Sequence, residues 1–203
     1  MNFEQLKKLF PTATKDTWHQ HPDGGGWVEN TASVDETAYI GPNAQVYMNA
    51  WVSENVQVCE SAQVFCSAEV SENAGVFGNA RIFENAQVHG YAQVYGNAQV
   101  SGYTHMYGNA HVFGNAKVYG HAQVYGGKWK VSPLYIQGTE HSVCICKPGV
   151  IRIGCEEHSI DEWLENYRVI GEKNKYSSDE IEEYGGYIKF INERRNQPNI
   201  CGK

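Results

Sequence analysis

A branched aliphatic residue returns at every sixth position over nearly half of the chain. Residues 28–123 divide into sixteen consecutive hexads without insertion or deletion, and their first position is Val thirteen times, Ile twice and Met once. The fifth position is Ala in every hexad except two, which carry Val56 and Thr104. An amphipathic helix repeats every 3.6 residues and a strand every two. A fixed period of six therefore predicts a solenoid whose coils bury their apolar edges against one another, and hexads are typical of a parallel β-helix.

The hexads resemble the hexapeptide-repeat family, in which three hexads form one coil of a left-handed triangular β-helix. The likeness rests on the aliphatic first position and the small fifth position, as in Val46 and Ala50, which point inward in that family. The second position departs from the family pattern, because Gly41 is the single Gly there and aromatic residues are frequent. The resemblance implies a mainly β fold, a left-handed parallel β-helix (hexapeptide-repeat solenoid), and assembly as a homotrimer.

The sequence on either side of the repeats predicts smaller attachments. Residues 1–27 read as an N-terminal capping helix and loop, with the helix over residues 3–10 closing the open first coil. We expect the β-helix over residues 28–127, a small α+β C-terminal module over 128–193 and a flexible tail over 194–203. Within the module, strands are predicted near 134–137, 142–146 and 150–153, followed by two helices that begin after Ser159 and Ser177. The sequence leaves open whether this module packs on its own solenoid or on a neighbour's.

Stacking three hexads per coil aligns the outward second positions into columns, and two of the three columns are rich in aromatic residues. Such columns at a solvated surface suggest a cover, and a partner subunit is the first choice. Two alternatives stay open: the C-terminal segment folds back over one column, or the stacked rings stabilise the surface alone. The expected oligomer contacts are Tyr47, Phe65 and Phe83 on one face and Phe77, Tyr95 and Phe113 on another.

Composition and charge argue against several classes of function and location. The net charge of −7 argues against general nucleic-acid binding and against an anionic membrane surface as partner. The chain has no apolar run long enough to cross a membrane, and its first residues lack the features of a secretory signal. Six scattered cysteines favour reduced thiols and a cytoplasmic location.

The C-terminal module carries a second resemblance. The stretch from Trp129 to Gly138, the triplet 153–155 and Trp163 are similar to a small module that follows repeat segments in uncharacterised phage and prophage proteins. The resemblance implies a mobile-element origin, with the host cell cytoplasm as the location, and it implies no established activity.

One basic segment stands out in an otherwise acidic chain. Residues 128–152 hold four basic residues against Glu140 alone, with aromatic and hydrogen-bonding residues among them. Cationic groups beside aromatic rings suit a small anionic ligand such as a nucleotide. The alternative is a solvated strand face. The candidate ligand-binding residues are Lys128, Trp129, Lys130, Tyr135, Gln137, His141, Lys147 and Arg152.

Acyl transfer and metal binding are the alternatives to this ligand-binding hypothesis. Many hexapeptide-repeat proteins resemble one another in being coenzyme A-dependent acyltransferases with a catalytic His; here His89, His105, His111 and His121 are available, yet no loop interrupts the coils. The metal candidates, His19 with His21 and the group His141, Cys144, Cys146, Cys155 and His158, lack paired Cys-x-x-Cys spacing, so we expect no metal.

The sequence thus favours a non-enzymatic oligomeric binding protein, phage-encoded, that captures a small anionic ligand or a host protein, with a possible role against host defence by analogy. A hexapeptide-repeat acyltransferase and a structural scaffold are the alternatives. No cofactor is expected.

Overall fold

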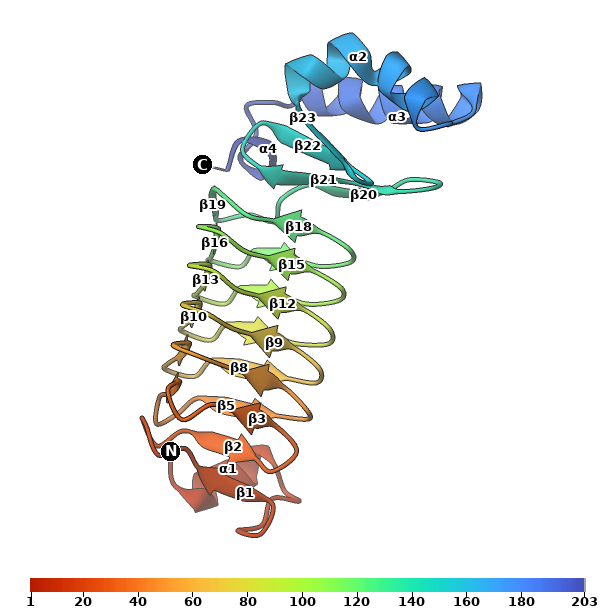
Figure 1. Cartoon of the computed structure of the whole chain (residues 1–203). Helices are drawn as coiled ribbons and strands as arrows, with labels where there is room; N and C mark the ends of the chain where they lie inside the picture. Colours follow the sequence, from red (N-terminus) through yellow and green to blue (C-terminus); the bar gives the residue numbers. More distant parts are fainter. Residues whose placement is uncertain (203) are drawn as a thin grey trace.

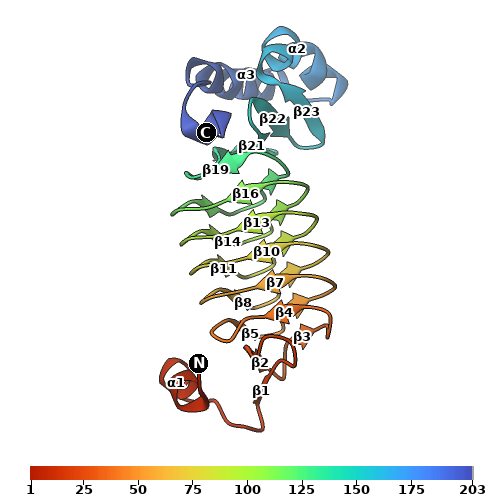
Figure 2. The same cartoon turned by 90° about the vertical axis from the view of Figure 1, so that its left-hand side faces the viewer.

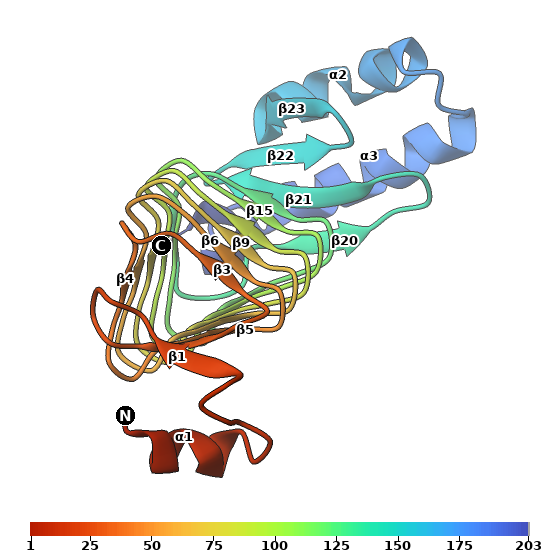
Figure 3. The same cartoon turned by 60° about the horizontal axis from the view of Figure 1, so that its bottom comes forward.

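The hexads form a β-solenoid of about six coils with three parallel sheets. The computed structural model describes residues 1–202. Paired strands in each sheet lie 18 residues apart in sequence, as in the pairing of Val46 with Val64, so three hexads make one coil. Viewed from the N-terminal end, the chain passes from β3 through β4 to β5 in the anticlockwise sense while it moves away from the viewer, which makes the solenoid left-handed (Figure 3).

Each of the three sheets holds six parallel strands of the solenoid, and sheet A has one further, antiparallel strand at its edge. Sheet A holds β2 (Trp27–Glu29), β5 (Gln45–Tyr47), β8 (Gln63–Phe65), β11 (Arg81–Ile82), β14 (Gln99–Val100) and β17 (Lys117–Val118). Sheet B holds β3 (Ser33–Val34), β6 (Trp51–Val52), β9 (Glu69–Val70), β12 (Gln87–Val88), β15 (His105–Met106) and β18 (Gln123–Val124). Sheet C holds β4 (Tyr39–Ile40), β7 (Gln57–Val58), β10 (Gly75–Val76), β13 (Gln93–Val94), β16 (His111–Val112) and β19 (Lys128–Trp129).

The first and fifth positions of the hexads form the core, as predicted. From Ile40 to Val124, every first-position side chain is at most 2% exposed. Thr104, which stands at a fifth position in place of the usual Ala, is fully buried too. Its hydroxyl donates to the Ser101 carbonyl oxygen at 2.6 Å, so this side chain brings no unpaired polar group into the core. Burial of these small apolar side chains along the whole axis stabilises the stack by the hydrophobic effect.

The N-terminal helix lies beside the solenoid rather than over its open end. Helix α1 (Phe3–Leu9) begins with a capping box between Asn2 and Gln5. It packs outside sheet A (Figures 2 and 3), where Leu6 is buried against the aromatic rings of that sheet. Strand β1 (Trp18–Gln20) pairs antiparallel with β2 and so covers the first edge of sheet A.

The solenoid continues one strand beyond the point where the hexads end. Strand β19 pairs with β16 in a register that sets Trp129 beside Val112, 17 residues earlier instead of 18. Trp129 is fully buried, and its indole nitrogen donates to the Gly126 carbonyl oxygen at 2.8 Å. A large ring therefore closes the core at the position where every earlier coil has an aliphatic residue, and the sequence-based boundary at residue 127 falls one strand early.

The C-terminal module is a four-stranded antiparallel sheet with two helices (Figure 1). Its strands are β20 (Tyr135–Gln137), β21 (Ser142–Lys147), β22 (Val150–Ile153) and β23 (Glu156–Ser159), and its helices are α2 (Ile160–Lys173) and α3 (Ser178–Glu193). Both helices begin with the Ser/Glu capping boxes that the sequence predicts. The fourth strand escapes prediction because its four residues are all polar and half-exposed.

The module packs on its own solenoid. The Tyr125 backbone N–H donates to the Cys146 carbonyl oxygen at 3.0 Å, and the Tyr125 hydroxyl donates to Glu157. The chain end is also held in place: α4 (Pro198–Cys201) buries Ile200 completely, and Gly149 N–H donates to the Ile200 carbonyl oxygen at 3.1 Å. Residues 194–202 therefore differ from the flexible tail that their polar sequence suggests, while Lys203 lies outside the described residues.

No helix within residues 1–202 has the length and apolar character that a membrane crossing requires.

A candidate ligand pocket in the C-terminal module

A pocket of about 140 Å³ lies between the end of the module's sheet and its two helices. Its lining is mostly apolar and aromatic with a few polar groups, which is the composition of small-molecule sites in general. The lining side chains come from the sheet, the helices and the segments between them: His141, Ile153, Cys155, Glu156, Trp163, Tyr167, Ile170, Asn174, Tyr176, Ile181, Tyr184 and Ile188.

Two close helix contacts set the spacing of the pocket walls. A Cβ atom at Gly171 of α2 would lie 2.7 Å from the Ile181 side chain, and one at Gly185 of α3 would lie 2.4 Å from the Tyr167 ring. Both distances are far below van der Waals contact, so only Gly permits this approach. Tyr167 packing on Gly185 also explains why α3 runs unbroken through Gly185 and Gly186, where helix propensity predicts a weak point.

A tyrosine and a histidine define the polar side of the pocket. The Tyr176 hydroxyl lies 2.9 Å from Nδ1 of His141. Tyr184 holds the His141 backbone, because its hydroxyl accepts from the His141 N–H at 2.7 Å and donates to the His141 carbonyl oxygen at 3.1 Å. Burial raises the pKa of Tyr176 to about 12, so its phenol stays protonated at neutral pH.

Glu156 supplies a carboxylate to the lining. One carboxylate oxygen accepts from the Asn174 amide at 3.0 Å, and the other lies 3.3 Å from Nε2 of His158. The hydrogen bonds from Asn174 and then from His158 lower the pKa of Glu156 below its ordinary value. Lys173 also approaches it at 3.7 Å, from an exposed position on the outside of α2. Glu156 is therefore ionised and fixed in direction.

Trp163 belongs to the pocket lining and is fixed as well. Its indole nitrogen donates to the Ile151 carbonyl oxygen at 2.9 Å, and the His158 ring meets it edge-on at 5.0 Å between centroids. Cys155, by contrast, is exposed at the rim.

The structure does not bring the eight sequence-predicted ligand residues together. His141 alone lines the pocket. Trp129 is buried in the last coil, so it cannot contact a ligand, and Lys128 pairs beside His111 on sheet C. The remaining five lie outside the pocket lining. Lys130 is exposed, and Tyr135 donates to Gln137. Lys147 and Arg152 both lie at the Tyr125–Glu157 pair, with Lys147 5.1 Å from the Tyr125 ring centroid and Arg152 3.6 Å from Glu157.

The metal and coil histidine candidates are likewise dispersed. Within residues 1–202, no three His, Cys, Asp or Glu side chains are placed to hold a metal ion. His21 is buried instead of solvated, with Nε2 3.2 Å from the Asp35 carbonyl oxygen. Of the coil histidines, His89 stacks on Tyr107 and His121 on Tyr103, while His105 and His111 lie on different sheets.

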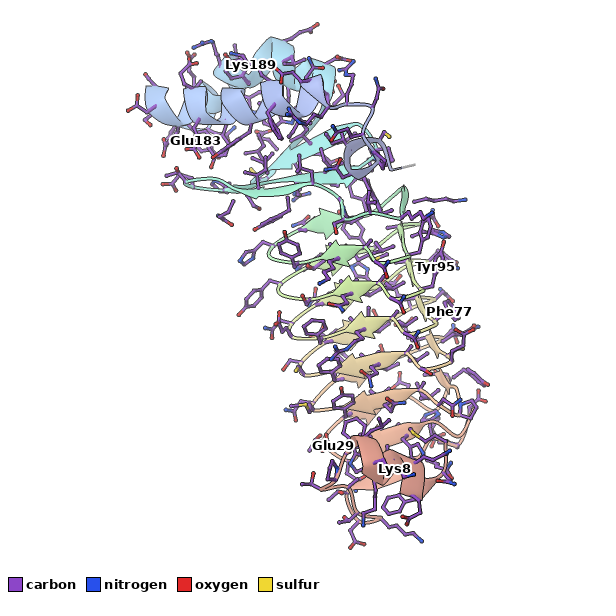
Figure 4. The ribbon with its side chains drawn as sticks, turned by 180° about the vertical axis from the view of Figure 1, so that it is seen from behind. Lys8, Glu29, Phe77, Tyr95, Glu183 and Lys189 are labelled. Carbon is purple, nitrogen blue, oxygen red and sulfur yellow. The ribbon has the colours of Figure 1, made fainter. Side chains whose placement is uncertain are left out.

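The two aromatic columns have different surroundings. Tyr47 and Phe65 are 8% exposed because the N-terminal segment of the same chain packs on them, and the half-exposed Phe83 lies at the border of that cluster. Tyr47 and Phe65 are thus already covered within one chain and are not a free surface for a partner subunit, while the assignment of Phe83 to an oligomer contact stays a prediction. Phe77, Tyr95 and Phe113 are half-exposed on sheet C, where Figure 2 shows no other element of the described chain in front of the strands. Figure 4 shows Phe77 and Tyr95 projecting on the same side from successive coils.

Comparison with known proteins adds one local match. A family model described as the YdcK beta solenoid repeat matches residues 92–108, which run from just before β13 to just after β15. No curated protein and no solved structure matches the chain. The match supports a repeat β-solenoid and says nothing of the module.

Proposed function

We propose that this chain is a non-enzymatic binding protein whose β-solenoid carries a module that holds a small organic ligand. The pocket between the module's sheet and its helices carries this proposal, because it combines aromatic walls with a few polar groups of fixed direction. Its volume of about 140 Å³ is close to the ~150 Å³ of an apolar cavity that holds benzene, so the buried part of the ligand has about six heavy atoms.

The polar groups of the pocket are suited to orienting a bound ligand. His141 is paired with Tyr176, and Glu156 is paired with Asn174 and His158. These hydrogen bonds fix the direction of both side chains before a ligand enters, which lowers the entropic cost of binding.

A pocket-filling variant tests the proposal. Ile170→Trp replaces an aliphatic side chain of the lining with a larger aromatic one. Val169→Trp, at an exposed position on the same helix, is the matched control. The probe is a panel of soluble fragments of five to ten heavy atoms, read by thermal unfolding. We expect at least one fragment to stabilise the wild type and Val169→Trp but not Ile170→Trp. No stabilisation of the wild type by any fragment, or equal stabilisation of Ile170→Trp, would contradict the proposal.

We also propose that the chain self-associates through sheet C, with a trimer favoured by the resemblance of the hexads to trimeric solenoids. The observation in favour is the column of Phe77, Tyr95 and Phe113, which is half-exposed and flat, with Tyr95 and Phe113 stacked at 5.0 Å and 7°. Unlike the column on sheet A, it has no helix of its own chain over it (Figure 2).

A further inference from the structure

The lining of the module pocket has an unequal charge distribution. Glu156 is the one ionised side chain among the lining residues, and no Lys or Arg belongs to them. Lys173 lies 3.7 Å from Glu156 but outside the lining, and it is 76% exposed, so solvent screens its charge. A small anion would meet the Glu156 carboxylate with no cation among the lining residues, so the pocket disfavours the anionic ligand that the basic segment suggests.

Four aromatic side chains complete the lining: Trp163, Tyr167, Tyr176 and Tyr184. The faces of such rings carry negative electrostatic potential and attract cations within about 6 Å. Tyr167 already shows this behaviour, because the Arg168 guanidinium lies 5.2 Å and the Lys189 ammonium 5.6 Å from its ring centroid. Tyr176 and Tyr184 stack with 5.3 Å between their ring centroids, and both belong to the lining.

Glu156 keeps its charge in this setting. Its hydrogen bonds from Asn174 and His158 lower its pKa, so it is a carboxylate throughout the physiological range. Aromatic rings together with one fixed carboxylate are the combination that recognises alkylammonium groups, because the rings replace water around the methyl groups while the carboxylate balances the charge.

We propose that the module pocket binds the ammonium group of a small organic cation, with the aromatic rings around its alkyl groups and Glu156 as its counter-ion. This inference rests on the proposed ligand-binding function and adds the chemical class of the ligand. A trimethylammonium group with one further carbon has five heavy atoms, which suits a volume of about 140 Å³.

Two probes of equal shape separate charge from size. Choline carries a trimethylammonium group, and 3,3-dimethylbutan-1-ol has the same heavy-atom skeleton with a neutral carbon in place of nitrogen. Titration calorimetry with each probe would measure affinity for the wild type, for Glu156→Gln, and for Glu165→Gln as a control. Glu165 is an exposed carboxylate of α2 outside the lining, so the control makes the same change in net charge.

We expect the wild type and Glu165→Gln to bind choline roughly 3- to 30-fold more tightly than the alcohol, the range that cation–π and counter-ion contacts provide. Glu156→Gln should lose most of this preference while its affinity for the alcohol and its unfolding temperature change little. Equal affinity for both probes in the wild type, or a choline preference that survives in Glu156→Gln, would overturn the cation assignment and leave the pocket as a neutral site. Failure of both probes would also overturn it, whereas the proposed function is judged separately by the fragment panel and Ile170→Trp.

Discussion

At the scale of single residues, the corners of the solenoid use two solutions for the same backbone conformation. From Met48 onward the third hexad position has positive φ. Residues with a side chain occupy it at Met48, Glu54, Glu60, Cys66, Glu72 and Glu84, and Gly occupies it at Gly78, Gly90, Gly96, Gly102, Gly108, Gly114 and Gly120. An L-residue with a side chain has an energetic cost of about 1–2 kcal/mol in this left-handed region. Glu84 offsets part of its cost, because its carboxylate accepts from the Gly102 N–H at 2.6 Å.

Gly96→Ala should therefore destabilise the solenoid. A Cβ atom at Gly96 would lie 3.0 Å from the Gly114 nitrogen in the next coil, so steric crowding adds to the backbone cost. We expect a loss of about 1–2 kcal/mol in the free energy of unfolding, measured by urea titration with far-UV circular dichroism. Glu60→Ala, in the same column of corners, already has a Cβ and should change stability by less than ~0.5 kcal/mol. Equal effects of the two substitutions would refute this explanation.

Cysteine reactivity gives a second test at this scale. Burial raises the pKa of the Cys146 thiol to about 12 and also raises that of Cys144, while Cys155 is exposed at the pocket rim. The thiolate is the reactive form. At pH 8 iodoacetamide should label Cys155 in the native protein long before Cys144 and Cys146, which should react only after denaturation. Peptide mass spectrometry measures the order, and labelling of Cys146 as fast as Cys155 would contradict the burial of the module–solenoid junction.

At the scale of elements, α1 and the aromatic column of sheet A form one small core. Tyr47 stacks on Phe65 at 4.8 Å and Phe65 on Phe83 at 5.1 Å, and Phe10 meets Tyr47 edge-on at 4.9 Å. Arg81 lies 5.0 Å from the Phe65 ring centroid at the end of the column. The N-terminal segment thus covers the lower part of one solenoid face and protects apolar rings from water.

Leu6→Ala should detach α1 from this surface. Leu6 is fully buried, and truncating a buried Leu costs about 2–5 kcal/mol, which is more than a seven-residue helix can withstand. Hydrogen exchange should become fast over residues 1–16 while the coils from β8 onward keep their protection. Leu9→Ala, at an exposed position of the same helix, is the control and should leave exchange unchanged. Unchanged protection of α1 in Leu6→Ala would show that other contacts hold it.

The elements that the sequence predicts well are those with a local pattern. The hexads predict the coils, the inward residues and the corners, and the Ser/Glu capping boxes predict both module helices. The buried positions of Trp129 and Ile200 could not be predicted from the sequence. Each is a single apolar side chain outside any repeat or helix pattern, and the residues that it packs against lie far away in sequence. The position of α1 escapes for a related reason: its apolar face predicts that it packs on something, and only the fold shows that this is sheet A.

At the scale of the whole molecule, the three solenoid faces are not equivalent. Helix α1 covers part of sheet A, whereas sheet C is open and carries its aromatic column (Figures 2 and 3).

Self-association through sheet C predicts that Tyr95→Glu lowers the oligomer number measured by sedimentation, because it places a charge in the middle of the column. Tyr91→Glu, at a 64% exposed corner close by, is the control and should leave the oligomer intact. A Tyr95→Glu protein that sediments like the wild type would remove sheet C as the interface.

The pocket could not be predicted from the sequence, because its walls come from three separate parts of the module. His141, the pair Cys155 and Glu156, and the tyrosines of α2, α3 and the segment between them share no spacing or motif. The basic segment 128–152 is the one local sequence pattern in the module that indicates a ligand site, and it indicates an anionic ligand. The lining of the folded pocket instead presents a carboxylate and aromatic rings. His141 is the residue that the two descriptions have in common.

Native mass spectrometry of the wild type, purified from cells without added ligand, tests the central claim most directly. A binding protein with this pocket should carry extra mass on each 22.7 kDa chain, which leaves on denaturation and is absent from Ile170→Trp. The released compound should be a small organic molecule, with an amine or quaternary ammonium group if the pocket selects cations. Extra mass that persists in Ile170→Trp, or a wild type that carries none and takes up neither fragments nor choline, would contradict the account.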